Sequence, residues 1–209
     1  MLELLTSGGW VMVPLILMAV IATAITLERS WSLRRSEVLP HGISHDIETW
    51  SRGKTLDNSE IQRLKSNSPL GELLAGALYV RHKPREVIKE RIEDVGRHVS
   101  HELNRFLPML GTIASVSPLL GLLGTVTGMI TMFLTILETG VGDANQLAGG
   151  IGQALISTAG GLCIAIPTLL LHRYFRGKVA GYVIKMEKVA MNLLDVLEAK
   201  QAESVNDAL

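Results

Sequence analysis

Cysteine is almost absent from this chain: Cys163 is the only one among 209 residues. An intrachain disulfide is therefore excluded. Because Cys163 lies in a hydrophobic run, we expect a buried, unreactive thiol. Phe, Tyr and Trp together make up only 4% of the residues, whereas there are 20 glycines. Glycine lets helices approach closely, since no side chain holds their backbones apart.

The net charge is zero, because 20 Lys and Arg balance 20 Asp and Glu. Nothing in this balance points to nucleic acid, and we expect no nucleic-acid partner. Hydrophobic residues make up 47% of the chain, and the mean hydropathy is +0.31. These values favour a membrane protein with a sizeable polar portion over a soluble enzyme.

Lys and Arg are absent from residues 1–27 and 106–171. Residues 28–105 hold 14 of them and residues 172–209 hold the other 6. A cation at the bilayer centre costs about 2.5–3.5 kcal/mol, and cytoplasmic segments retain Lys and Arg. The two basic segments are therefore predicted to be cytoplasmic, which requires three membrane crossings.

We predict an all-α polytopic membrane protein with three transmembrane helices, whose long helices extend into a cytoplasmic helical bundle. The positive charges follow the first apolar run, whereas those of a cleaved signal peptide precede it. We therefore expect an uncleaved first span flanked by Trp10 and Trp31 as interfacial anchors. The predicted segments are an outer N-terminus (1–9), the three spans (10–27, 106–137 and 146–171), a cytoplasmic helical loop (28–105), an outer loop (138–145) and a cytoplasmic C-terminal helix (172–209).

Helical periodicity continues through the polar segments. Pro69 or Leu70 is predicted to open a helix that runs to about His82, and one continuous helix is predicted over Val87–Leu137. Residues 199–209 are expected to form a frayed tail. Two apolar stripes at helical spacing are expected to pack antiparallel below the membrane: Ile88, Ile92, Val95, Val99, Leu103 and Phe106, and Val179, Val183, Met186, Ala190, Leu193 and Leu197.

Histidines do not form a recognisable metal site. His41 and His45 have no further ligand nearby, and His98 and His101 lie with Glu102 on what reads as a solvated helix face. Zinc needs three or four convergent ligands. We expect no metal and no cofactor, and the absence of paired carboxylates or a nucleophile at membrane depth argues against an enzyme.

The two runs 107–137 and 144–171 are uncharged but rich in glycine and hydroxyl side chains. Small residues recur at helical spacing, which lets helices touch. Gln153 is the most polar side chain well inside either run, and an amide in hydrocarbon must find partners. A proton path usually needs a titratable group, and the three predicted spans contain no Asp, Glu, Lys, Arg or His. Either no proton is transported, or a partner supplies the carboxylate.

Two motifs make the chain resemble a known family. Residues 118–129 (PLLGLLGTVTGM), and residues 150–162 (GIGQALISTAGGL) with the Ala-Ile-Pro of 165–167, are similar to the second and third spans of the ExbB/TolQ/MotA family. Length and loop pattern are most similar to ExbB. The resemblance implies a pentamer around two copies of a single-span, ExbD-like partner whose membrane Asp carries protons. It also implies a TonB-like protein, a bacterial inner membrane and a periplasmic N-terminus.

By motif match, the resemblance implies that Thr125 and Thr158 line the ion path. Many family members have Glu where this chain has Gln153, which suits a hydrogen-bonding or packing role here. The residues expected at contacts between helices or with the partner are Gln153, Ser117, Gly121, Gly124, Gly128, Ser157 and Pro167. Two other functions stay open: a TolQ-like role in envelope maintenance, and a passive membrane scaffold.

Overall fold

The computed structural model describes residues 9–40, 57–140 and 144–206, and every regular element within these ranges is a helix. Contacts divide the chain into two compact units. Residues 1–28 and 106–174 form one, which we call the apolar unit, and residues 29–105 and 175–209 form the other, which we call the polar unit. The predicted all-α class is confirmed.

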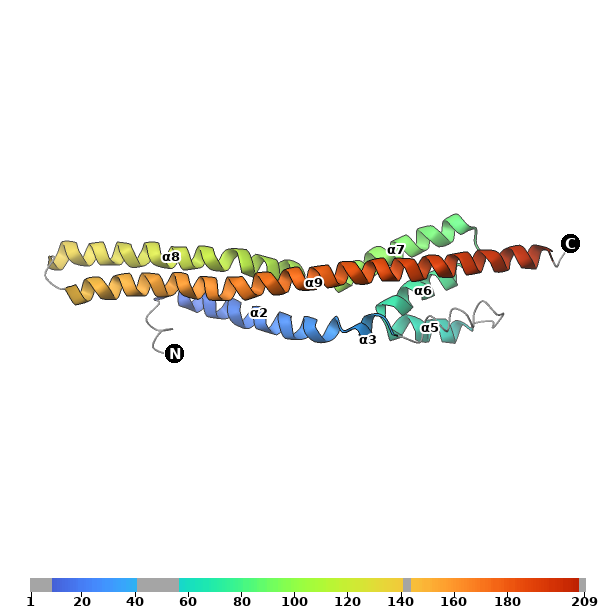
Figure 1. Cartoon of the computed structure of the whole chain (residues 1–209), viewed down its shortest axis with the longest axis horizontal. Helices are drawn as coiled ribbons and strands as arrows, with labels where there is room; N and C mark the ends of the chain where they lie inside the picture. Colours follow the sequence, from blue (N-terminus) through green and yellow to red (C-terminus); the bar gives the residue numbers. More distant parts are fainter. Residues whose placement is uncertain (1–8, 41–56, 141–143, 207–209) are drawn as a thin grey trace. The chain divides into compact units, whose positions relative to one another are not determined.

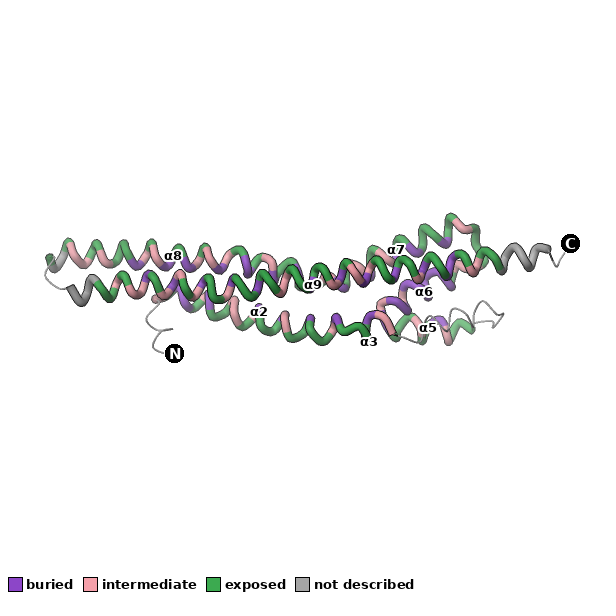
Figure 2. The backbone as a smooth tube through the Cα atoms, viewed as in Figure 1, coloured by how far each residue is buried: buried purple, intermediate pink, exposed green. Residues whose placement is uncertain are grey.

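Three long helices build the apolar unit: α2 (Met12–Ser32), α8 (Leu107–Thr139) and the first part of α9 (Ala144–Asn206). Each contains a stretch long and apolar enough to cross a membrane, because about 20 apolar residues of helix span the hydrocarbon core. In this unit α8 and α9 run antiparallel side by side, and α2 lies along them (Figure 1). Much of their outward surface is exposed in the single chain (Figure 2).

The polar unit contains α3 (Arg35–Val38), α5 (Asn58–Asn67), α6 (Pro69–Tyr79), α7 (Arg85–Leu103) and the remainder of α9. A capping box formed by Asp57 and Glu60 starts α5, and it satisfies amide donors that the first helical turn leaves unbonded. The Ser68 hydroxyl accepts a hydrogen bond of 3.0 Å from the Gly71 amide and so starts α6. This start agrees with the predicted one.

Helix α6 supplies the centre of the polar unit, because all of its residues from Leu70 to Leu78 except Glu72 are buried. It lies close to α7 at Gly76, where a methyl group would be 2.9 Å from Cγ2 of Val95. Glycine is needed at this close approach, since the bulk of a second side chain would push the two helices apart.

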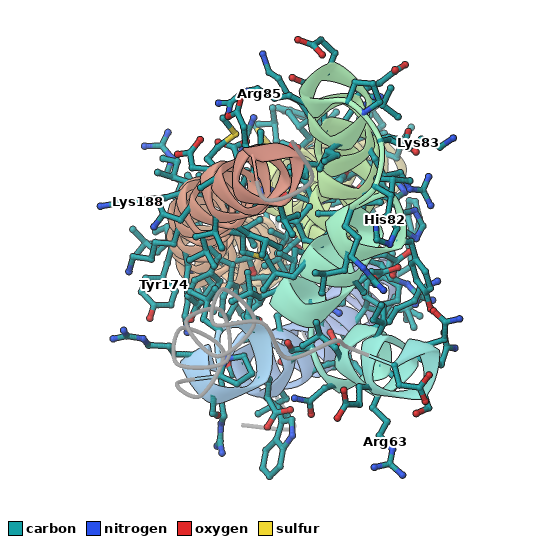
Figure 3. The ribbon with its side chains drawn as sticks, turned by 90° about the vertical axis from the view of Figure 1, so that its right-hand side faces the viewer. Arg63, His82, Lys83, Arg85, Tyr174 and Lys188 are labelled. Carbon is teal, nitrogen blue, oxygen red and sulfur yellow. The ribbon has the colours of Figure 1, made fainter. Side chains whose placement is uncertain are left out.

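Helices α7 and α9 are joined within the polar unit by charge and by apolar contact. Arg85 donates to Asp195 over 3.1 Å and also to Glu198, and the Asp195 hydrogen bond is the main cause that raises the pKa of Arg85. The predicted stripes lie inward, since their residues are buried or half-buried apart from Phe106. Charged side chains such as Lys83 and Lys188 project outward (Figure 3).

The continuous helix predicted over residues 87–137 is wrong, because the chain breaks between α7 and α8. Asn104 ends α7, and its side-chain amide donates back to the Ser100 carbonyl over 2.8 Å. Phe106 then adopts a left-handed conformation with φ 64°, which L residues with a bulky side chain seldom adopt. The buried Arg29 donates to the Leu103 carbonyl at 3.4 Å and so satisfies part of the exposed end of α7.

The predicted frayed tail from residue 199 is also wrong over most of its length, since α9 continues to Asn206. Helical propensity explains this, because Ala, Lys, Gln and Glu dominate residues 198–203 and favour the helix. His41 and His45 lie outside the described residues. The helix predicted to reach about His82 ends at Tyr79.

The break at Phe106 can be tested by comparing Phe106→Ala with Phe106→Gly. Both variants lose the ring, so their difference reports the backbone alone. In a left-handed position, Gly is expected to be more stable than Ala by about 1 kcal/mol, whereas inside a helix Ala is more stable than Gly by about 1 kcal/mol. Thermal unfolding of the two purified variants measures the order, and a more stable Ala variant would show that the helix is continuous.

Candidate functional site

The site is built on the close approach of α8 and α9. A methyl group at Gly161 would lie 2.6 Å from the Ser117 carbonyl oxygen, and one at Gly121 would lie 2.9 Å from the Ser157 carbonyl oxygen. Both distances are shorter than a van der Waals contact, so the two backbones touch only because these positions lack a side chain. Such glycine contacts replace the hydrophobic effect, which cannot drive helices together inside lipid.

The contact continues toward the loop that joins the two helices. Gly124 faces the side chain of Ser157, and a methyl group at Gly128 would lie 3.3 Å from the Cβ of Ala154. Ser117 and Ser157 are fully buried, and their hydroxyls donate to carbonyls of their own helices, Ile113 at 2.7 Å and Gln153 at 3.0 Å. The small residues therefore serve packing within the chain and leave no buried hydroxyl unsatisfied.

Helix α2 covers one edge of the α8–α9 pair. Val11, Met12 and Leu15 form a buried cluster against Leu120 and Ile164. Two glycines of the pair also lie close to these residues. A methyl group at Gly160 would lie 3.4 Å from Cε of Met12, and one at Gly124 would lie 3.6 Å from Cβ of Val11. These contacts of α2 all lie on the same edge of the pair.

Gln153 lies at the start of α2. Its side-chain amide nitrogen is the atom that a side chain at Gly9 would meet first. Gly9 has φ +72°, so both its conformation and the close amide require glycine. The structure therefore places the half-buried Gln153 against its own chain, on the α2 side.

Thr125 and Thr158 lie on the edge away from α2. At about 100° per residue, Thr125 stands about 40° to one side of Gly121, and Gly124, which contacts α2, stands about 60° to the other. On α9, Thr158 stands about 100° to one side of Ser157 and Gly160 about 60° to the other. We call this edge, marked by Thr125 and Thr158, the hydroxyl edge.

Hydrogen bonds bring the two threonines to one level. The Thr158 hydroxyl donates across the helix pair to the Gly121 carbonyl at 3.2 Å, which is the carbonyl that the Thr125 amide faces within α8. The Thr125 hydroxyl donates to the Leu122 carbonyl at 2.6 Å. Each hydroxyl can still accept a hydrogen bond from a ligand. Both residues are half-buried, so part of each remains accessible from the hydroxyl edge.

The other polar residues of the spans have local roles. The hydroxyls of Thr127, Thr131 and Thr135 donate to carbonyls of α8 at 3.0 Å, as expected for a satisfied membrane helix. Pro167 is exposed within α9, and its missing amide leaves the Cys163 carbonyl without the usual helical donor.

The expectation of a buried Cys163 is wrong for the single chain, because this residue is exposed. It stands about 120° from Ser157 on the α2 side of α9. Hydrophobic neighbours in the sequence therefore did not imply a protein contact. No group of three or more metal-binding side chains occurs among the described residues.

One residue of interest was not predicted from the sequence. The ring of His172 lies against Gly111 of α8, where a methyl group would be 3.1 Å from both Cε1 and Nε2 of the imidazole. The signal in the sequence was its spacing, since His172 follows Thr158 by fourteen residues, close to four helical turns.

Known proteins have sequences similar to this one. The sequence matches the MotA/TolQ/ExbB proton channel family over residues 63–188. It is 34% identical over 176 residues to a putative biopolymer transport protein, ExbB-like 1, of Synechocystis. The match covers 83% of this chain and 69% of the relative. A second Synechocystis protein, ExbB-like 3, is 32% identical with 81% and 82% covered. The ExbB of Salmonella typhimurium is 34% identical over 51% of this chain and 42% of its own length.

Gly161→Ala tests the helix contact on which the site depends. The added methyl group would meet the Ser117 backbone at 2.6 Å, so α8 and α9 must move apart. We expect a loss of stability of about 1–3 kcal/mol, seen as a lower midpoint of thermal unfolding in detergent. Gly152→Ala is the matched control on the same helix, because nothing lies within 4 Å of a methyl group there. Equal stability of the two variants would contradict the contact.

Proposed function

Because this chain belongs to the MotA/TolQ/ExbB proton channel family, we propose that it is an ExbB-like subunit of a motor driven by the proton-motive force in the bacterial inner membrane. An ExbD-like single-span protein is the proposed partner and supplies the membrane Asp. Through a TonB-like protein, the complex energises TonB-dependent transport across the outer membrane.

The observation that carries this proposal is a hydroxyl edge without a charge. Helix α8 has no Asp, Glu, Lys, Arg or His from Leu107 to Leu137, and α9 has none from residue 144 to residue 171. A proton crossing lipid needs a titratable group, so the acid must come from another chain. A carboxylate on a single-span helix beside Thr125 and Thr158 would complete the path.

The two threonines suit this task because a hydroxyl both donates and accepts hydrogen bonds without a charge of its own. Thr158 is positioned by its bond to Gly121 and keeps lone pairs for water or for a protonated carboxyl. One proton crossing 100 mV releases about 2.3 kcal/mol. Several subunits around one partner dimer, five by resemblance, would let successive protons drive successive steps.

The exposed apolar surface supports a homo-oligomer in a bilayer. Leu119 and Leu122 of α8 and Leu155 of α9 are more than half exposed in the single chain. Lipid and neighbouring copies are the surroundings in which such side chains cost no free energy. The cations at residues 28–105 and 172–209 favour a cytoplasmic C-terminus and a periplasmic N-terminus.

Two other functions remain to be distinguished. A TolQ-like subunit would use the same hydroxyl edge for envelope maintenance, so only the process driven would differ. A passive scaffold would need the helix contact of Gly121 and Gly161 but not the hydroxyls of Thr125 and Thr158. Substitution of those hydroxyls therefore separates a motor from a scaffold.

Thr125→Val and Thr158→Val are expected to lower partner-dependent proton flux and energy transfer on the order of tenfold each, since each removes a hydroxyl from the path. Valine has the same shape, so assembly should be kept. Flux is measured in vesicles that contain the purified complex and a trapped pH-sensitive dye, and energy transfer is measured as iron-siderophore uptake by cells.

Thr131→Val is the matched control, because the Thr131 hydroxyl bonds to its own helix away from the hydroxyl edge. Copurification of the partner confirms assembly of each variant. Wild-type uptake and flux in both hydroxyl-edge variants would leave the scaffold as the better function.

A further inference from the structure

Three pairs of residues follow one another along the hydroxyl edge at intervals of seven. On α8 these are Gly111, Pro118 and Thr125, and on α9 they are His172, Ala165 and Thr158. Seven residues turn a helix by about two full turns with a drift of 20°, so all three lie on one side. Because α8 and α9 are antiparallel, the two sets follow the same edge in opposite chain directions.

Two contacts support this register at its ends. Gly111 touches the ring of His172, and Gly121, one turn from Thr125, accepts the hydrogen bond of Thr158. Fourteen residues of helix cover about 21 Å. His172 therefore lies on the same edge as the threonine pair, about 21 Å toward the end that carries Arg173.

Midway between these ends, Pro118 changes the polarity of the edge. Proline has no amide hydrogen, so the Ala114 carbonyl lacks its usual helical donor. Ala114 and Ala165 are nearly buried and small. Between the hydroxyls and the imidazole, this edge therefore carries small side chains and a carbonyl oxygen without an intrahelical donor.

The chemistry of His172 differs from that of every other group on this edge. It is the only histidine of the apolar unit, and imidazole is the side chain that gains and loses a proton near neutral pH. Helix α8 brings no charged group to it between Leu107 and Leu137. The charged residues nearest in sequence are Arg173 and Arg176 on α9, and Glu28 and Arg29 end the run of α2.

We propose that His172 is a proton-transfer residue at the cytoplasmic end of the hydroxyl edge; this inference rests on the function proposed above. A proton that leaves the partner carboxyl beside Thr125 and Thr158 passes through water to a ring nitrogen of His172. The imidazolium then releases a proton to water on the Arg173 side. The ring returns to its neutral form, and no other bond or electron changes.

Gly111 positions the imidazole in this proposal. The absence of a side chain lets the ring approach the α8 backbone, where a methyl group would be only 3.1 Å away from it. This contact holds the ring at the edge of the helix pair, between the path and the water beyond Arg173.

The test uses the full chain in complex with its copurifying partner, in vesicles with a trapped pH-sensitive dye. His172→Phe keeps a flat ring against Gly111 and removes the titrating nitrogens, and His172→Gln keeps a polar side chain if the Phe variant fails to assemble. Flux is expected to fall on the order of tenfold. Its dependence on the pH of the Arg173 side should disappear.

Chemical rescue separates proton transfer from a structural role. Imidazole added on the Arg173 side should restore at least about half of the flux lost in His172→Ala, and it should not affect Thr158→Val. His82→Phe is the control, because His82 is exposed in the polar unit (Figure 3).

The outcomes distinguish this inference from the function on which it rests. If Thr125→Val and Thr158→Val lose flux while His172→Phe and His172→Gln keep wild-type flux and pH dependence, the function stands and the role of His172 is overturned. Loss of flux without imidazole rescue assigns His172 to structure and also overturns it. A wild-type complex without proton flux would overturn both.

Discussion

The structure depends on the contact of two helix backbones at Gly121 and Gly161. Inside lipid, apolar side chains gain little by leaving one apolar surrounding for another, so close packing and shared hydrogen bonds must hold the helices together. At Gly161 the space to the Ser117 carbonyl is too small for a methyl group. The same approach brings the Thr158 hydroxyl to the Gly121 carbonyl, so the packing interaction also builds the proposed ion path.

Helix α2 makes the two edges of this pair unequal. Its buried cluster of Val11, Met12 and Leu15 covers one edge and receives Gln153 against Gly9. Polar groups on that edge are therefore engaged within the chain. The hydroxyl edge keeps two half-buried threonines that a ligand can approach, without a charge that would be costly at that depth. An uncharged hydroxyl edge suits a carboxylate from another chain, because only the carboxylate then loses hydration at that depth.

The proposed path extends beyond the threonines because both helices keep a seven-residue register along one edge. Thr125 and Thr158 mark one end, Pro118 and Ala165 the middle, and Gly111 and His172 the other end. In the polar unit a different requirement dominates. Arg29 caps α7. Phe106, the first residue of the apolar unit after α7, adopts a left-handed conformation, so α7 and α8 are separate helices.

Charge distribution and periodicity in the sequence alone determined the helical class, the three apolar spans and the small-residue stripes, because these depend on the cost of burying a charge and on the repeat of a helix. Only the tertiary structure decided which face of each span meets another helix. It placed Gln153 against Gly9, exposed Cys163 and broke the helix at Phe106, since these outcomes depend on neighbours distant in the sequence. It also brought His172 to Gly111, a contact between residues that no local pattern connects.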